Sequence, residues 1–70
     1  MDIKQLRYFI ATAKYLNFTE AAKHLYLAQP ALSRQIADLE DYLGTQLFIR
    51  DKRGLKLTAA GSELLIGAKE

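Results

Sequence analysis

The sequence contains no cysteine, and it has a single histidine and a single proline. Without cysteine the chain can form neither disulfides nor thiolate metal sites, and one histidine cannot supply a metal cluster. We therefore expect no metal site and no cofactor. No apolar run reaches the length of a membrane-spanning helix, and residues 1–4 lack the basic-then-apolar layout of a signal peptide. We expect a cytoplasmic protein with no membrane association.

Charge is distributed unevenly along the 70 residues, a length that allows one domain with a small core. The net charge of +2 is too small to indicate nucleic acid by itself. Basic side chains are concentrated in residues 50–56. This segment contains Arg50, Lys52, Arg53 and Lys56 and one acid, Asp51. A local basic segment of this kind is expected of a surface that meets phosphate.

Two helices are predicted in the first part of the chain, the first of them from apolar residues at steps of three and four. The first covers residues 3–15, with Asp2 as its cap and Asn17 as its left-handed stop. The second is short, covers residues 20–26, and is capped by Thr19.

A third helix is predicted over residues 30–43, opened by Pro30 and ended by Gly44. So few residues separate it from the second helix that the two must cross at a steep angle, as in a helix-turn-helix. Its buried face is expected to hold Leu32, Ile36, Leu39 and Leu43.

The periodicity changes after Gly44. Residues 47–49 and 55–57 are predicted to be two short strands joined by a turn at 50–54, and Thr58 is expected to cap a last helix that runs to residue 70. The fold class is therefore mainly α: a winged helix-turn-helix with a two-stranded β-wing. We divide it into a winged helix-turn-helix domain, 1–57, and the start of a further helix, 58–70.

The first two turns of the third helix carry no acid, unlike the turns that follow. Gln29, Ser33 and Arg34 lie there beside unpaired backbone N–H groups, so this end is expected to enter a major groove. Arginine can pair with guanine and glutamine with adenine. Within the wing, Arg50 and Arg53 are expected to meet phosphate or a minor groove.

Plainer interpretations remain for each feature. The polar helix face and the basic turn are each compatible with simple solvation, and a winged helix can serve protein contacts alone. Ser33 has no nucleophile elbow and His24 no evident orienting acid, so we expect no enzyme. The aromatic residues Tyr8, Phe9, Tyr15 and Phe18 are expected in the core, not as a base-stacking platform.

Several blocks resemble LysR-type transcriptional regulators, nearly over the whole chain and without gaps. The blocks are residues 6–9, residues 18–22, residues 28–36, Leu39-Glu40, Leu43-Gly44, Leu47-Phe48, Arg50, and Leu57-Thr58 followed by Gly61. The resemblance implies a cytoplasmic regulator that binds interrupted palindromes in double-stranded DNA as a homo-oligomer. It also implies that Gln29, Pro30, Ser33 and Arg34 meet the major groove and that Arg50 and Arg53 are wing contacts.

Complete members of this family carry a carboxy-terminal effector-binding domain, which is absent here, so a small-molecule effector is expected to act only through that missing part. The family also dimerises through the helix after the wing. That helix is truncated at residue 70, so we expect this fragment to form a weak dimer. Ala28 stands where the family often has Ser or Thr, and Leu16 where Gly is frequent, so Asn17 is expected to turn the chain.

Overall fold

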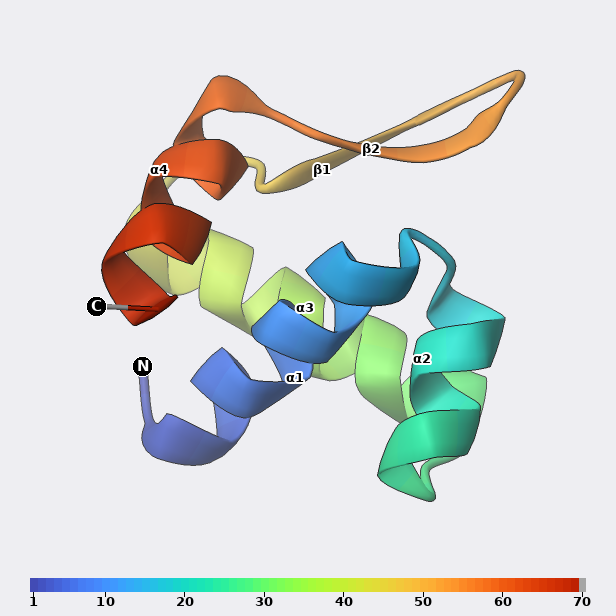
Figure 1. The fold of residues 1–70 in the computed structure, drawn as a ribbon. Helices are drawn as coiled ribbons and strands as arrows, with labels where there is room; N and C mark the ends of the chain where they lie inside the picture. Colours follow the sequence, from blue (N-terminus) through green and yellow to red (C-terminus); the bar gives the residue numbers. More distant parts are fainter. Residues whose placement is uncertain (70) are drawn as a thin grey trace.

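The computed structural model describes residues 1–69, which form four helices and a two-stranded antiparallel sheet (Figure 1). In chain order the elements are α1 (Ile3–Tyr15), α2 (Phe18–Leu25), α3 (Gln29–Leu43), β1 (Phe48–Asp51), β2 (Gly54–Leu57) and α4 (Ala59–Lys69). This confirms the predicted mainly helical winged helix-turn-helix. No helix in the described part of the chain is long and apolar enough to cross a membrane. The predicted end of the last helix, residue 70, lies outside the described residues.

The turn between α1 and α2 differs from the prediction at two residues. Leu16, not Asn17, adopts the left-handed conformation, with φ 49°, and its N–H donates to the Thr12 carbonyl oxygen at 2.8 Å. Asn17 is extended and caps α2 in place of Thr19, because its side-chain oxygen accepts the Glu20 N–H at 3.0 Å. A cap contributes about 1 kcal/mol, which helps offset the cost of about 1–2 kcal/mol for a left-handed leucine.

The other helix ends follow the sequence more closely. The Asp2 carboxylate accepts the Gln5 N–H at 2.7 Å, as predicted for the start of α1. At its far end α2 stops at Leu25, one residue early, because Tyr26 is left-handed with φ 58°. Similarly, α3 begins one residue before Pro30, and no side chain caps it at Ala28.

The core lies where α3 crosses beneath α1 and α2, with the base of the hairpin packed on top (Figure 1). Its largest fully buried side chains include Phe9, Leu32, Ile36, Leu39 and Leu47. Leu43, predicted to be buried, is instead 37% exposed. It lies in the last turn of α3, where residues 41–46 are all exposed, so the helix here extends beyond the elements that cover it.

The hairpin turn is tighter than predicted. Arg50 pairs with Leu55 and Asp51 with Gly54, so both belong to strands, and only residues 52 and 53 form the turn. The side-chain oxygen of Asp51 accepts the Arg53 N–H at 2.8 Å, and Gly54 takes φ 119°, which a glycine adopts without strain. The predicted five-residue turn at 50–54 is therefore wrong, and Arg50 lies on β1.

Two features fix α4 against the hairpin. Thr58 caps it as predicted: its hydroxyl accepts the Gly61 N–H at 3.0 Å and donates to the Gln46 carbonyl oxygen at 2.7 Å. Gly61 is buried so closely that a Cβ there would lie 2.3 Å from the Leu47 carbonyl oxygen. Because the helix begins directly after β2, its position depends on the base of the hairpin.

Candidate nucleic-acid interface

The exposed end of α3 presents the residues that the sequence singled out. Pro30 and Arg34 are exposed, and Gln29 and Ser33 are half-buried one turn apart. The Gln29 side-chain amide donates to the Ser33 hydroxyl oxygen at 2.7 Å, so these two side chains hold each other in place. The acids Asp38 and Asp41 are exposed as well, but they lie on the later turns of the helix.

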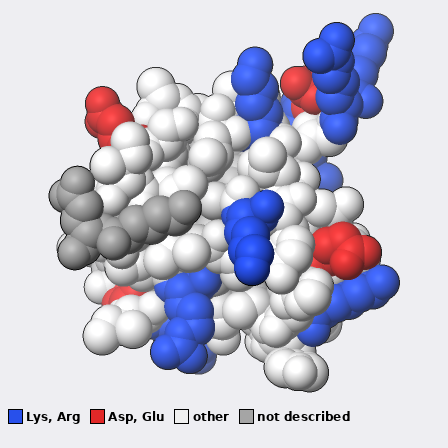
Figure 2. Space-filling model, viewed as in Figure 1, with Lys and Arg blue, Asp and Glu red and all other residues white. Residues whose placement is uncertain are grey.

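The hairpin carries the basic residues outward from the body of the domain. Figure 2 shows Lys and Arg side chains gathered at the end of the molecule that the β1–β2 hairpin occupies in Figure 1. Lys52 and Arg53 form the turn there and are exposed. Asp51 is the acid of this segment, and its side-chain oxygen is engaged by the Arg53 backbone.

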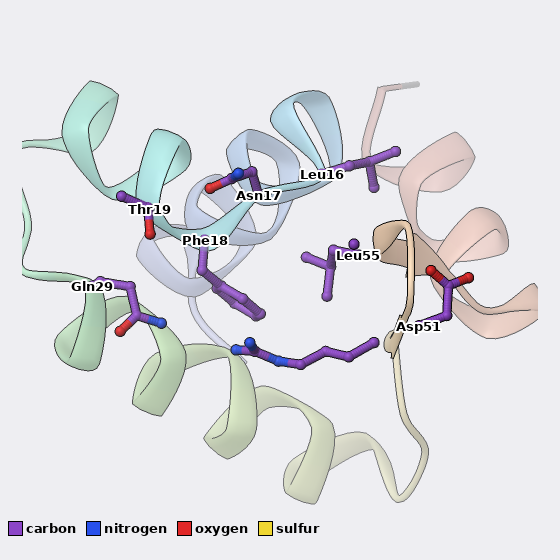
Figure 3. Close-up of a pocket in the computed structure, with 9 residues that line it drawn as sticks. Leu16, Asn17, Phe18, Thr19, Gln29, Asp51 and Leu55 are labelled. Atoms are coloured by element: carbon purple, nitrogen blue, oxygen red, sulfur yellow. The ribbon is translucent and has the colours of Figure 1, made fainter.

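Arg50 does not follow Arg53 to the tip of the wing. It leaves β1 toward α2, and its guanidinium carbon lies 5.1 Å from the centroid of the Phe18 ring. Arg50 and Phe18 both line a hollow of about 270 Å³ that also includes Thr19 and Gln29 (Figure 3). A neighbouring hollow, lined among others by Ser33, again contains Arg50 and Phe18.

Three of the six expected site residues line two adjoining hollows that share Arg50: Gln29 lines the first and Ser33 the second. Arg34 and Pro30 lie on the same helix, on its exposed side, and Arg53 stands apart at the hairpin tip. Sequence reasoning placed Phe18 in the core, and it is only half-buried, with its ring available to Arg50. The sequence alone offered no signal for this pair, because the contact depends on how far the hairpin folds back.

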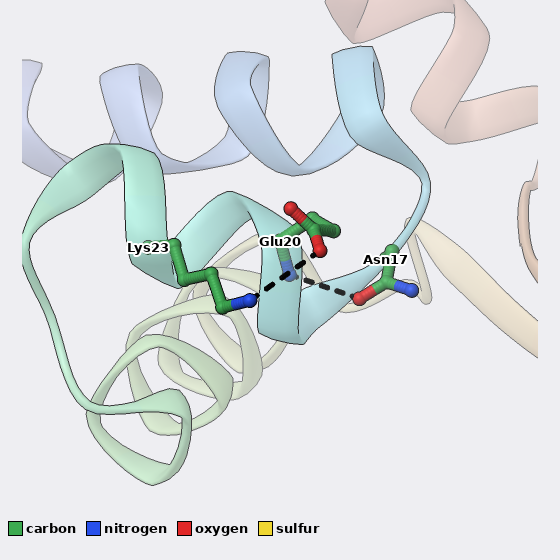
Figure 4. A network of polar contacts seen from close by, with 3 residues as sticks. All are labelled: Asn17, Glu20 and Lys23. Atoms are coloured by element: carbon green, nitrogen blue, oxygen red, sulfur yellow. Dashed lines mark hydrogen bonds and ion pairs between the residues drawn. The ribbon is translucent and has the colours of Figure 1, made fainter.

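Few acids neutralise these cations. Within residues 1–69 the structure contains one ion pair, Lys23 with Glu20 at 3.7 Å, and both side chains are largely exposed. Figure 4 shows this pair beside the side chain of Asn17, which caps the start of α2. Arg34, Arg50 and Arg53 have no carboxylate within ion-pair distance in the described part of the chain, so their charges are available to a ligand.

Glu40 was not recognised from the sequence as a structural contact. One oxygen of its carboxylate accepts the backbone N–H groups of Leu47 and Phe48, at 2.6 Å and 3.3 Å. This ties the start of β1 to the carboxy-terminal part of α3. The Glu40 side chain, which also lines the second hollow, therefore helps to fix the orientation of the wing relative to α3.

The chain is similar to known proteins in both sequence and structure. The family model described as "bacterial regulatory helix-turn-helix protein, lysR family" matches residues 3–62. The Hca operon transcriptional activator HcaR of Escherichia coli K12 is 56% identical over 61 residues, covering 87% of this chain and 21% of HcaR. The regulator BsdA of Bacillus subtilis 168 is 54% identical over 71 aligned positions, covering 100% of this chain and 24% of BsdA. The chain spans about a fifth to a quarter of these relatives.

Solved structures match along almost the entire chain. A complex named CbnR_DBD-DNA superposes with a TM-score of 0.92 at 46% identity, covering 99% of this chain and 79% of that one. The BenM_DBD complex with catB site 1 DNA gives a TM-score of 0.93 at 45% identity, covering 99% and 78%. In both cases the fold and the sequence are similar over 99% of this chain.

Proposed function

This chain belongs to the LysR family of bacterial regulatory helix-turn-helix proteins, and on that premise we propose that it binds duplex DNA sequence-specifically to regulate transcription. The observation that carries the proposal is the start of α3, where Gln29, Ser33 and Arg34 lie without an acid among them beside a cationic hairpin. The matched structures CbnR_DBD and BenM_DBD were solved on DNA, which supports the same role here.

In this proposal the first two turns of α3 enter the major groove. Arg34 is exposed and unpaired within the described chain, so its guanidinium can reach the O6 and N7 atoms of a guanine. Gln29 binds the N6 and N7 atoms of an adenine, and Ser33 contacts a phosphate or a base edge. Pro30 contributes an apolar contact at the start of the helix.

The wing acts on the DNA backbone beside that groove. Arg53 lies at the hairpin tip and reaches phosphate or the minor groove, while Arg50 lies nearer to α3. Neither contact requires the hairpin to read a sequence. The wing is therefore expected to contribute affinity and register, and α3 to contribute specificity.

The role of the whole protein extends this assignment. Residues 1–57 are the DNA-binding domain and 58–70 the start of a linker helix through which the protein pairs on an interrupted palindrome. A small-molecule effector acts through a carboxy-terminal domain outside these 70 residues. The protein works in the cytoplasm as a regulator and catalyses no reaction, in keeping with relatives that are transcriptional regulators.

Selection of bound sequences from a random duplex pool, followed by a salt titration on the winner, tests this function. We expect enrichment of a short inverted repeat and an affinity that falls steeply with salt, because cations on the protein displace counterions from phosphate. A winged helix that serves only protein contacts would enrich no sequence and would show no such salt slope.

A further inference from the structure

The two wing arginines lie in different places. If the chain binds DNA as proposed, they therefore contact different parts of the duplex. Arg53 lies in the turn at the hairpin tip, whereas Arg50 lies on β1 with its guanidinium over Phe18. We propose that Phe18 positions Arg50 as a fixed cation at the edge of α3, so that Arg50 binds one backbone phosphate there and does not enter the minor groove with Arg53.

The Phe18 ring holds the arginine without neutralising it. The ring centroid lies 5.1 Å from the guanidinium carbon, within the range of a cation–π contact, and it lies 6.1 Å from the centroid of the Phe48 ring in an edge contact. A carboxylate partner would fix Arg50 equally well but would cancel the charge that phosphate requires. Asp51 is adjacent in sequence, yet its oxygen is engaged by Arg53 and no ion pair joins it to Arg50 in residues 1–69.

The surroundings of Arg50 suit a phosphate oxygen. Thr19 and Gln29 line the same hollow and can each donate a hydrogen bond, and Asn17 borders it with an amide group. Figure 3 shows Thr19 and Gln29 facing the hollow from α2 and α3, while the Asp51 carboxylate points away from both. The hollow therefore offers one cation and neutral donors, with its one acid turned aside.

The test is a scan of the selected duplex in which one backbone phosphate at a time is replaced by a neutral methylphosphonate. We expect the wild-type chain to lose about tenfold in affinity at one phosphate beside the α3 site, the size of a charge-assisted hydrogen bond. Arg50→Ala should bind weakly and lose nothing further at that position. Arg53→Ala should keep the full loss there.

Two substitutions at neighbouring rings isolate the positioning role. Phe18→Leu should weaken binding about two- to fivefold and shrink the loss at that same phosphate, whereas Phe18→Tyr, which keeps the ring, should behave as wild type. Phe48→Leu is the matched control. The Phe48 ring packs against Phe18 and Phe9, but the cation–π contact of Arg50 is with the Phe18 ring. The substitution should lower the melting temperature and leave the phosphate pattern unchanged.

The outcomes separate this inference from the function on which it rests. A wild-type chain that selects no sequence overturns the proposed function itself. A chain that selects DNA, but whose Arg50→Ala variant keeps the wild-type phosphate pattern, overturns only the assignment of Arg50. An unchanged pattern in Phe18→Leu shows that Phe18 has only a structural role.

Discussion

Gln29 and Arg34 differ in how much freedom their side chains retain before DNA is bound. Gln29 is half-buried and donates to Ser33 at 2.7 Å, so its amide is already oriented. Arg34 is exposed, and no hydrogen bond or ion pair to it is found in the described residues, so it must lose rotamer freedom on binding. Gln29, already oriented, loses little conformational entropy when it binds a base. Arg34 loses more, so its contact with the base must contribute more free energy to give the same net affinity.

The first prediction concerns Arg34. Its replacement, Arg34→Ala, should reduce the free energy of binding to the preferred sequence by about 1–3 kcal/mol, the usual cost of losing a bidentate contact to a base. It should also relax the preference at one position of the site. Repeating the selection with the variant measures both effects. An equal loss on every sequence would mean that Arg34 contacts phosphate instead.

For single residues, the sequence predicted local roles such as helix caps better than contacts between distant residues. Asp2 and Thr58 were identified as caps because their partners lie three residues ahead in the same helix. Asn17 was misassigned because asparagine suits both a left-handed stop and a cap, and the sequence does not say which neighbour takes the other role. The contact of Phe18 with Arg50 could not be predicted, since it joins residues from α2 and β1.

Among the elements, the wing is fixed to the helices by contacts at its base, where β1 begins. Glu40 on α3 accepts two N–H groups at the start of β1, and the tip makes no comparable contact with the helices in the described residues. The period of apolar residues predicted α1 and α3, the expected caps Thr19 and Thr58 indicated α2 and α4, and the change in period after Gly44 predicted the strands. What they could not predict was the register, which depends on the Asp51 turn, nor the tie through Glu40.

The second prediction tests that tie. Glu40→Ala leaves the N–H groups of Leu47 and Phe48 without their acceptor in a partly buried place, so the free energy of unfolding should fall by about 1–3 kcal/mol. Urea unfolding followed by circular dichroism measures it. The exposed acid Asp41, one residue further along α3, supplies the control: Asp41→Ala should change stability by no more than about 0.5 kcal/mol. Equal losses in both variants would contradict the tie.

The third prediction compares two glycines on α4. Gly61→Ala should destabilise the domain by about 1–3 kcal/mol, because the added Cβ would overlap the Leu47 carbonyl oxygen, a backbone atom that cannot move aside cheaply. Gly67→Ala meets nothing within 4 Å and should stabilise the helix by about 0.5–1 kcal/mol. Thermal unfolding of the two variants decides; a shift in the same direction for both would rule out the steric account.

For the whole molecule, the surface left over for pairing is small. Within α4, Ala60, Leu64 and Leu65 pack against the core, while Ile66 is 62% exposed and Ala59 is also exposed. Eleven residues of α4 present too little apolar area for a standard protein interface.

The fourth prediction follows from that surface. At micromolar concentration this 70-residue chain should sediment as a monomer or a weakly associating dimer, and it should pair firmly on a palindromic duplex, where the DNA supplies a high effective concentration. Sedimentation velocity with and without the duplex measures both states. Ile66→Glu should weaken pairing on DNA while leaving binding to a single half-site unchanged. A tight dimer without DNA would contradict this picture.

The contact between Gly61 and Leu47 has a mechanical consequence. Thr58 and Gly61 fasten the first turn of α4 to the start of the hairpin, and no flexible linker lies between β2 and α4. The helix α4 and the hairpin therefore form one rigid unit, and Glu40 joins this unit to α3. In the proposed dimer on DNA, a twist at the far end of α4 would pass directly to the wing, and the angle between the two α4 helices would set the spacing of the two wings.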